Sequence, residues 1–72
     1  MNKRIVSDPT ICGGEPCVVG TRIQTSVILS HLAAGDSYDE ILKHFPRLTR
    51  EDILAVLEYA AYLSTEKAVA LE

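Results

Sequence analysis

Residues 37–65 read SYDEILKHFPRLTREDILAVLEYAAYLST, and this stretch decides the fold. Ser37 is followed three residues later by Glu40, which is the pattern of a capping box. Thr49 and Asp52 repeat the pattern with a shorter acid. In a capping box the two side chains satisfy backbone N–H groups of the first turn that lack an intrahelical partner. The stretch therefore predicts one helix that begins after Ser37 and a second that begins after Thr49.

A short break separates these two helices. Pro46 cannot continue the first helix, and it disfavours helical backbone at the preceding Phe45. A helix of about eight residues, a turn of about three to four residues and a longer helix form a helix-turn-helix outline. DNA-binding modules use this outline, but plain three-helix cores use it as well. The outline thus predicts a geometry and leaves the function open.

A further helix is expected upstream of this unit. Thr25 is the expected N-terminal cap, the helix should end near Ala34, and Gly35 should adopt the left-handed conformation common just past a helix C-terminus. On the third helix we expect an inward face centred on Ile53 and Leu57, because apolar side chains recur there at helical spacing. The expected core consists of Ile28, Leu32, Ile41, Leu42, Phe45, Ile53 and Leu57.

The opposite side of the third helix carries an unusual aromatic pair. At about 100° per residue, Ala55, Tyr59 and Tyr62 should project away from Ile53 and Leu57. Tyrosine is favoured at protein interfaces, where it supplies a large apolar area with a polar tip. These three residues are therefore the candidate interface with a partner or a second copy. The alternative is that the tyrosines only contact the N-terminal strands.

The first 22 residues follow a different pattern. Short β-prone runs at residues 5–6, 10–12 and 17–19 predict a hairpin or meander, closed by a turn at residues 20–22. The whole chain is expected to form a single domain, 1–72. We divide it into a strand arm (residues 1–22), a three-helix unit (residues 23–66) and a tail (residues 67–72).

Length and charge restrict the function classes. Seventy-two residues lie near the lower limit for a self-sufficient core, so we expect a homodimer, in contact through the strands around residues 4–19 and the outer face of the third helix. The net charge of −3 argues against a non-specific nucleic-acid coat protein, although a dimer could still gather its arginines on one face. We find no transmembrane run and no signal-peptide pattern, and therefore expect a cytoplasmic protein.

Four cations surround the expected helix-turn-helix. Arg22 lies at the exit of the strand region, and Lys43 and Arg47 flank the turn. Arg50 opens the third helix, at the position where a recognition helix presents its first residues to base edges. These four residues are the candidate DNA-binding set. The alternative is that they solvate the surface or pair with acids.

Residues that could carry chemistry are few. Cys12 and Cys17 are expected to be small buried hydrophobes rather than a disulfide, and His31 and His44 lack the spacing of metal ligands. No nucleophile, base and orienting group can be assembled on paper. We therefore expect no enzymatic activity, no catalytic residues, no metal and no cofactor. A small redox or metal protein built on the two cysteines is the minor alternative.

Short motifs run along the chain in a characteristic order: Ile5, Asp8-Pro9, Gly14-Glu15-Pro16, Gly20-Thr21-Arg22-Ile23, Ala34-Gly35, Glu40-Ile41, Phe45-Pro46-Arg47-Leu48-Thr49 and Asp52-Ile53. Together they resemble the small bacterial family called domain of unknown function 433, over about residues 4–62. Cys12 and Cys17 depart from the pattern, since other small or apolar residues are expected there.

The resemblance implies a mostly α fold, in which a homeodomain-like or winged-helix-like helix-turn-helix of three helices is preceded by short N-terminal β-strands. It also implies the antitoxin half of a type II toxin–antitoxin pair, beside a PIN-like nuclease toxin. Our leading hypothesis is a homodimeric antitoxin that binds operator DNA, autoregulates and neutralises this toxin. The alternative is a non-enzymatic protein-interaction module with a DNA-binder-like fold.

Overall fold

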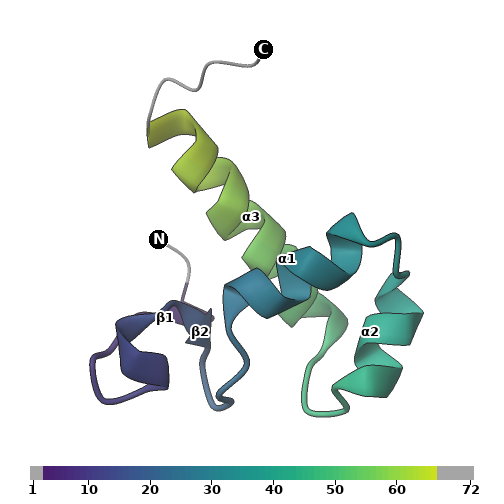
Figure 1. Ribbon diagram of the computed structural model, residues 1–72, viewed down its shortest axis with the longest axis horizontal. Helices are drawn as coiled ribbons and strands as arrows, with labels where there is room; N and C mark the ends of the chain where they lie inside the picture. Colours follow the sequence, from purple (N-terminus) through teal and green to yellow (C-terminus); the bar gives the residue numbers. More distant parts are fainter. Residues whose placement is uncertain (1–2, 67–72) are drawn as a thin grey trace.

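Three helices follow a small two-stranded sheet in the computed structural model, which describes residues 3–66 (Figure 1). The elements are β1 (Ile5–Val6), the short 3-10 helix η1 (Cys12–Gly14), β2 (Cys17–Val18), α1 (Thr25–Ala33), α2 (Tyr38–His44) and α3 (Arg50–Glu66). The predicted mostly α fold with N-terminal strands is confirmed. The expected tail, 67–72, lies outside the described residues. None of the helices within residues 3–66 has the length and apolar character needed to span a bilayer.

Both predicted capping boxes are present. At the start of α2 the Ser37 N–H donates to Glu40 Oε1 at 2.7 Å, and the Glu40 N–H donates to Ser37 Oγ at 3.2 Å. At the start of α3 the Thr49 N–H donates to Asp52 Oδ2 at 2.9 Å, and the Asp52 N–H donates to Thr49 Oγ1 at 3.2 Å. Phe45 leaves the helical region ahead of Pro46, with φ −124° and ψ 80°. The local sequence therefore sets where both helices begin and where α2 ends.

α1 differs from the prediction at its start and agrees at its end. Thr25 is not the cap: it is the first helical residue and is buried, while Gln24 occupies the cap position without a side-chain bond. The reason is tertiary, because the Thr25 N–H donates to the Pro16 carbonyl at 3.0 Å. At the other end Gly35 has φ +95°, and its N–H donates to the Leu32 carbonyl. The predicted left-handed glycine is thus confirmed.

The N-terminal arm contains two strands within residues 3–66, so it is a hairpin and not a meander. β1 and β2 pair antiparallel, with Ile5 opposite Val18 and Val6 opposite Cys17. The predicted strand at residues 10–12 is wrong. Asp8 Oδ1 accepts hydrogen bonds from the backbone N–H and the hydroxyl of Thr10, at 2.8 and 2.7 Å, which turns the chain sharply. Positive φ angles over residues 12–14, of +53°, +63° and +89°, then complete the reversal.

The core contains most of the expected side chains and some that sequence reasoning missed. Predicted core residues Ile28, Ile41 and Ile53 are fully buried, whereas Leu32, Leu42 and Phe45 are partly buried against them. The burial predicted for Leu57 is wrong, since 36% of this residue is exposed. Cys17 is buried, as the sequence predicted, and the buried apolar residues missing from the expected core are Ile5, Val18, Leu48, Ala55 and Val56.

The inward face of α3 is rotated by about a quarter turn from the predicted one, at about 100° per residue. Ala55 and Val56 are buried and Tyr59 packs partly buried against the core, so the outward orientation predicted for Ala55 and Tyr59 is wrong. Of the predicted outer face, Tyr62 is the residue that is well exposed, at 49%. The reason is that α3 contacts β1 as well as α1 and α2, and must bury a face toward each.

One ion pair joins the strand arm to this helix. Arg4 immediately precedes β1, and its guanidinium donates a hydrogen bond to Asp52 Oδ1 at 2.9 Å. The other carboxylate oxygen of Asp52 caps α3, and the Asp52 side chain is only 10% exposed. A single carboxylate therefore holds both the start of α3 and the N-terminal strand.

Asp52→Ala should lower the free energy of unfolding by about 2–3 kcal/mol. The substitution removes a cap worth about 1 kcal/mol and a charge-assisted hydrogen bond, discounted because half of the Arg4 side chain is in solvent. Glu51→Ala removes the same charge from an exposed position in the same turn, and should change the stability by less than about 0.5 kcal/mol. Urea unfolding measures the free energy of unfolding of both variants. Equal losses would mean that the two bonds of Asp52 contribute nothing beyond its charge.

Ile53→Ala and Leu57→Ala together test the rotation of α3. Ile53 is fully buried, and its truncation should cost about 2–5 kcal/mol. Leu57 is 36% exposed, so its truncation should cost about 1 kcal/mol or less. Thermal and urea unfolding measure both. If Leu57→Ala lowered the free energy of unfolding as much as Ile53→Ala does, the inward face of α3 would be the one predicted from the sequence.

Candidate functional site

The turn that leaves β2 meets the turn that precedes α3, and each carries an arginine. Arg47 Nη2 donates to the Gly20 carbonyl at 3.1 Å. Arg22 and Arg47 line one surface recess together with Ile11 and Thr21. Two of the four predicted DNA-binding residues are thus brought to a single site, although they come from turns that are far apart in the sequence.

The turn beneath these arginines is held by its own hydrogen bonds. Gly20 has φ +81°, a backbone conformation that residues other than glycine rarely adopt. The Thr21 hydroxyl donates to the Val18 carbonyl at 2.8 Å and accepts from the Ile23 N–H at 3.1 Å. Because its backbone is fixed in this way, the turn presents Arg22 from a defined position.

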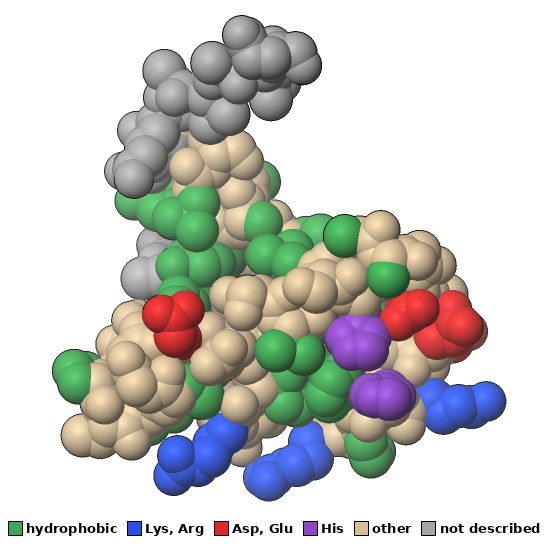
Figure 2. Space-filling model, viewed as in Figure 1, with side chains coloured by type: hydrophobic (Ala, Val, Ile, Leu, Met, Phe, Trp, Pro, Cys, Tyr) green, Lys and Arg blue, Asp and Glu red, His purple; other side chains and the backbone are tan. Residues whose placement is uncertain are grey.

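The other two predicted cations lie outside this recess. Lys43 is exposed in the last turn of α2. Arg50 is the first residue of α3, and its guanidinium carbon lies 4.7 Å from the centroid of the Tyr38 ring, a cation–π distance. On the face shown in Figure 2, the Lys and Arg side chains follow the lower edge and the carboxylates lie above them. On this face the cations therefore lie at the end of the molecule remote from the C-terminal end of α3.

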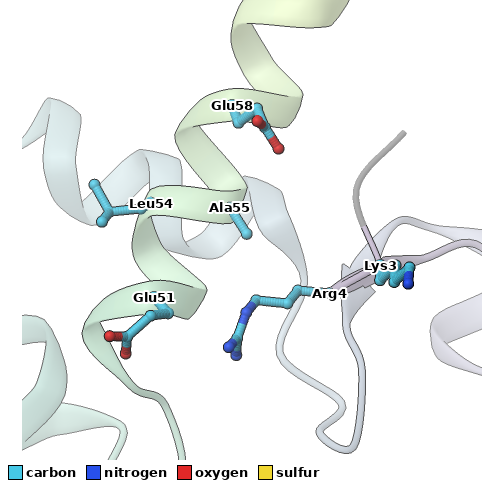
Figure 3. A pocket seen from close by; sticks show the side chains of 6 residues that line it. All are labelled: Lys3, Arg4, Glu51, Leu54, Ala55 and Glu58. Carbon is cyan, nitrogen blue, oxygen red and sulfur yellow. The ribbon is translucent and has the colours of Figure 1, made fainter.

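The acids in the first turn of α3 are directed differently from each other. Asp52 is turned inward onto Arg4 and Thr49. Glu51 remains exposed and lines a second recess, between α3 and the start of the chain, together with Lys3 and Arg4 (Figure 3). In that view the Glu51 carboxylate and the Arg4 guanidinium lie on opposite sides of α3. The Asp52 carboxylate is therefore already paired with Arg4 inside the chain, whereas the Glu51 carboxylate remains exposed.

A ring cluster that sequence reasoning missed joins α1 to the end of α2. The centroids of His31 and His44 lie 5.2 Å apart, and the ring of Phe45 packs edge-on against both, at 5.3 and 5.0 Å. His31 Nδ1 also lies 2.7 Å from Asp36 Oδ2. The two histidines are on separate helices, so no local spacing announced their contact. Across residues 3–66, no group of three or more His, Cys, Asp or Glu side chains is arranged to hold a metal ion.

Both cysteines are free thiols, in η1 and β2, and both contact the turn that carries Arg22. Cys12 Sγ donates to the Arg22 carbonyl at 3.3 Å, and Cys17 Sγ donates more weakly to the Thr21 carbonyl at 4.0 Å. Burial raises the pKa of the Cys17 thiol above 9.0, and the neighbouring Cys12 raises it further. A raised pKa keeps Cys17 protonated, which is the opposite of a reactive thiolate. The environment of Cys17 is that of a structural residue.

Because the pKa of Cys17 is higher in the folded chain than in the unfolded chain, stability should fall as the pH rises above 9.0. In that window the unfolded chain releases the thiol proton more readily, so the folded chain binds more protons. Unfolding free energies at pH 7 and at successive values above 9 should therefore decline less in Cys17→Ala than in the native chain. Cys12→Ala keeps the burial of Cys17 and should retain most of the decline. Parallel pH profiles in all three proteins would contradict this assignment.

Comparison with known proteins gives the chain a family. The family model described as "Protein of unknown function (DUF433)" matches residues 5–60 of the chain. The "Uncharacterized protein y4eO" of Sinorhizobium fredii (strain NBRC 101917 / NGR234) is 38% identical over 56 residues, which are 78% of this chain and 25% of that protein. The chain thus spans about a quarter of the length of this relative. No solved structure matches the chain. The resemblance inferred from the motifs is confirmed: the chain belongs to the DUF433 family.

Proposed function

We propose that the chain is a DNA-binding, antitoxin-like module that acts as a homodimer and has no catalytic chemistry of its own. The observation that carries the proposal is the convergence of Arg22 and Arg47 on one recess, with Arg47 anchored on the Gly20 carbonyl. The proposal includes a cognate PIN-like toxin, which the family resemblance implies, and the cytoplasmic location expected from the sequence.

The arginine recess suits a phosphate group. A guanidinium carries five N–H donors in a planar fork, and Arg47 uses one nitrogen on Gly20, so its orientation is set while other donors remain for a ligand. Arg22 enters the same recess from a turn that is fixed by the Thr21 hydroxyl. Two guanidinium groups in one recess, with that of Arg47 already oriented, favour an anion because little freedom of the Arg47 side chain is lost on binding.

The start of α3 suits contact with bases. Arg50 is the first residue of the helix and is held on the Tyr38 ring. A helix N-terminus carries a partial positive charge, which favours nearby phosphate. Asp52 would oppose phosphate if it were free, but it bonds Arg4 and the Thr49 N–H. The net charge of −3 is therefore compatible with a local cationic surface around the turn.

Antitoxin activity is the second part of the proposal. A chain that blocks a toxin by binding it needs no catalytic residues, in keeping with the lack of a catalytic set in the sequence. The identity of the toxin is expected from the neighbouring open reading frame. Co-expression of the two should relieve the growth arrest caused by that neighbour alone; a neighbour that is harmless, or whose toxicity is unaffected, removes the antitoxin part and leaves the DNA part standing.

The DNA part is tested by titrating upstream DNA at several salt concentrations. With two to four phosphate contacts per subunit, a dimer neutralises about four to eight phosphates, and log affinity should fall against log salt with a slope of roughly −4 to −7. Arg22→Ala and Arg47→Ala should weaken binding to all sequences alike and flatten the slope by about 1 for each phosphate that is no longer neutralised. Arg50→Ala should in addition relax specificity by about 1–3 kcal/mol.

Lys3→Ala is the matched control. It removes the same charge from a separate exposed recess, where Glu51 and Glu58 are neighbours, and should leave the slope unchanged. An equal effect of Lys3→Ala would mean that only overall charge matters. If upstream DNA binds no better than random DNA, with or without the neighbouring gene product, the DNA role fails. The protein-interaction module then becomes the better description, and the exposed apolar side chains of α3 favour it.

A further inference from the structure

The C-terminal half of α3 is an apolar helix that extends beyond the rest of the fold (Figure 1). Residues 57–65 read LEYAAYLST and contain one charge, that of Glu58. Leu57, Tyr62 and Leu63 are 36, 49 and 47% exposed. A surface helix normally has a charged outer face, and one that is apolar on several sides is normally covered. This half of α3 therefore has too much exposed apolar surface for contact with water alone.

A groove lies beside this segment, between α1 and α3. Thr25, Ser26 and Leu29 line one wall, and Tyr59, Ala60 and Leu63 line the other. None of its lining residues carries a charge. The small side chains of Ser26 and Ala60 leave space for the ridge of another helix, which packs with its axis about 8–10 Å away.

We propose that this groove receives the C-terminal half of α3 from a second copy of the chain, so that two copies pair about a twofold axis through α1 and α3. A twofold interface uses the same patch on both partners, which must be self-complementary. This chain has both parts of such a patch, the groove and the protruding apolar helix, and they share Leu63. The proposal gives a surface to the homodimer of the proposed function.

Charge favours a second copy over a different partner. Each chain has a net charge of −3, so two copies repel except where their surfaces lack acids. The groove meets this condition, because no acid lines it. Leu54 is also exposed, at 50%, but the recess beside it is bordered by Lys3, Glu51 and Glu58. A partner of a different kind would be selected by complementary charge, and the groove offers none.

A pairing surface of this kind has to reach the area of a typical interface. A standard interface buries about 800 Å² on each partner, close to one sixth of the 5085 Å² surface of the chain. The groove and the exposed side of α3 beyond it run along the longest helix of the fold. Arg22 and Arg47 do not line the groove, so pairing there leaves the cationic recess open on both copies.

The proposal is tested by measuring the oligomeric state of the native chain and of Leu63→Glu, by sedimentation and by light scattering. The native chain should show the dimer mass at concentrations of tens of micromolar, an ordinary range for a small interface, and a melting temperature that rises with protein concentration. Leu63→Glu places a carboxylate from each copy in the groove and should give a monomer that remains helical by circular dichroism. Ser26→Lys, at an exposed position on the other wall of the groove, is the second variant and should also weaken the dimer.

Leu54→Glu and Val19→Glu are the controls, since both side chains are as exposed as Leu63 and lie outside the groove. Both variants should remain dimers. A native chain that stays monomeric at about 100 μM overturns the proposal. So does a dimer that Leu54→Glu or Val19→Glu dissociates while Leu63→Glu does not, because the copies would then meet at the strand arm. No DNA enters these measurements, so failure of the dimer surface and failure of DNA binding are separate results.

Discussion

The carboxylate of Asp52 is the constraint on which the arrangement of this small fold depends. One oxygen accepts the Thr49 N–H and starts α3, and the other accepts the Arg4 guanidinium and holds the strand arm against that helix. Its side chain is 10% exposed, which shields the bond to the Thr49 N–H, whereas the bond to Arg4 is partly screened because half of the Arg4 side chain lies in solvent. This double attachment ties the start of α3 to the strand arm.

The rotation of α3 determines which of its surfaces remain available. Because β1 covers one side of the helix, Ala55 and Tyr59 are used inside the chain, and Leu57 and Tyr62 are left outside. The strands cover the helix only near its N-terminal half, where Ala55 lies. The C-terminal half extends past α1 and beyond the strand arm (Figure 1). The same packing that completes the core thus exposes an apolar segment of the longest helix.

The two turns illustrate how short motifs become a site. The Gly20 turn needs a left-handed glycine, and the break before α3 needs Pro46; each is a local requirement. The hydrogen bond from Arg47 to the Gly20 carbonyl connects them and creates a cationic recess that neither turn has alone. The free thiols of Cys12 and Cys17 bond carbonyls of this same strand-exit turn, so they take part in its structure. Arg22 therefore stands on a supported backbone.

The elements whose causes are local could be predicted from the amino-acid sequence. The Ser37 and Thr49 capping boxes, the break at Pro46 and the left-handed Gly35 each depend on bonds between residues a few positions apart, and a pattern can therefore reveal them. The family membership, which rests on motifs spread along the chain, was also readable from the sequence. Tertiary structure alone decided the rotation of α3, the bond between Pro16 and Thr25, the pairing of Arg4 with Asp52 and the meeting of Arg22 with Arg47. These contacts join residues far apart in the chain, and helical periodicity cannot tell which of several neighbouring elements will cover which face. A helix with apolar residues on more than one side fits several rotations equally well, until the strand that packs against it selects one.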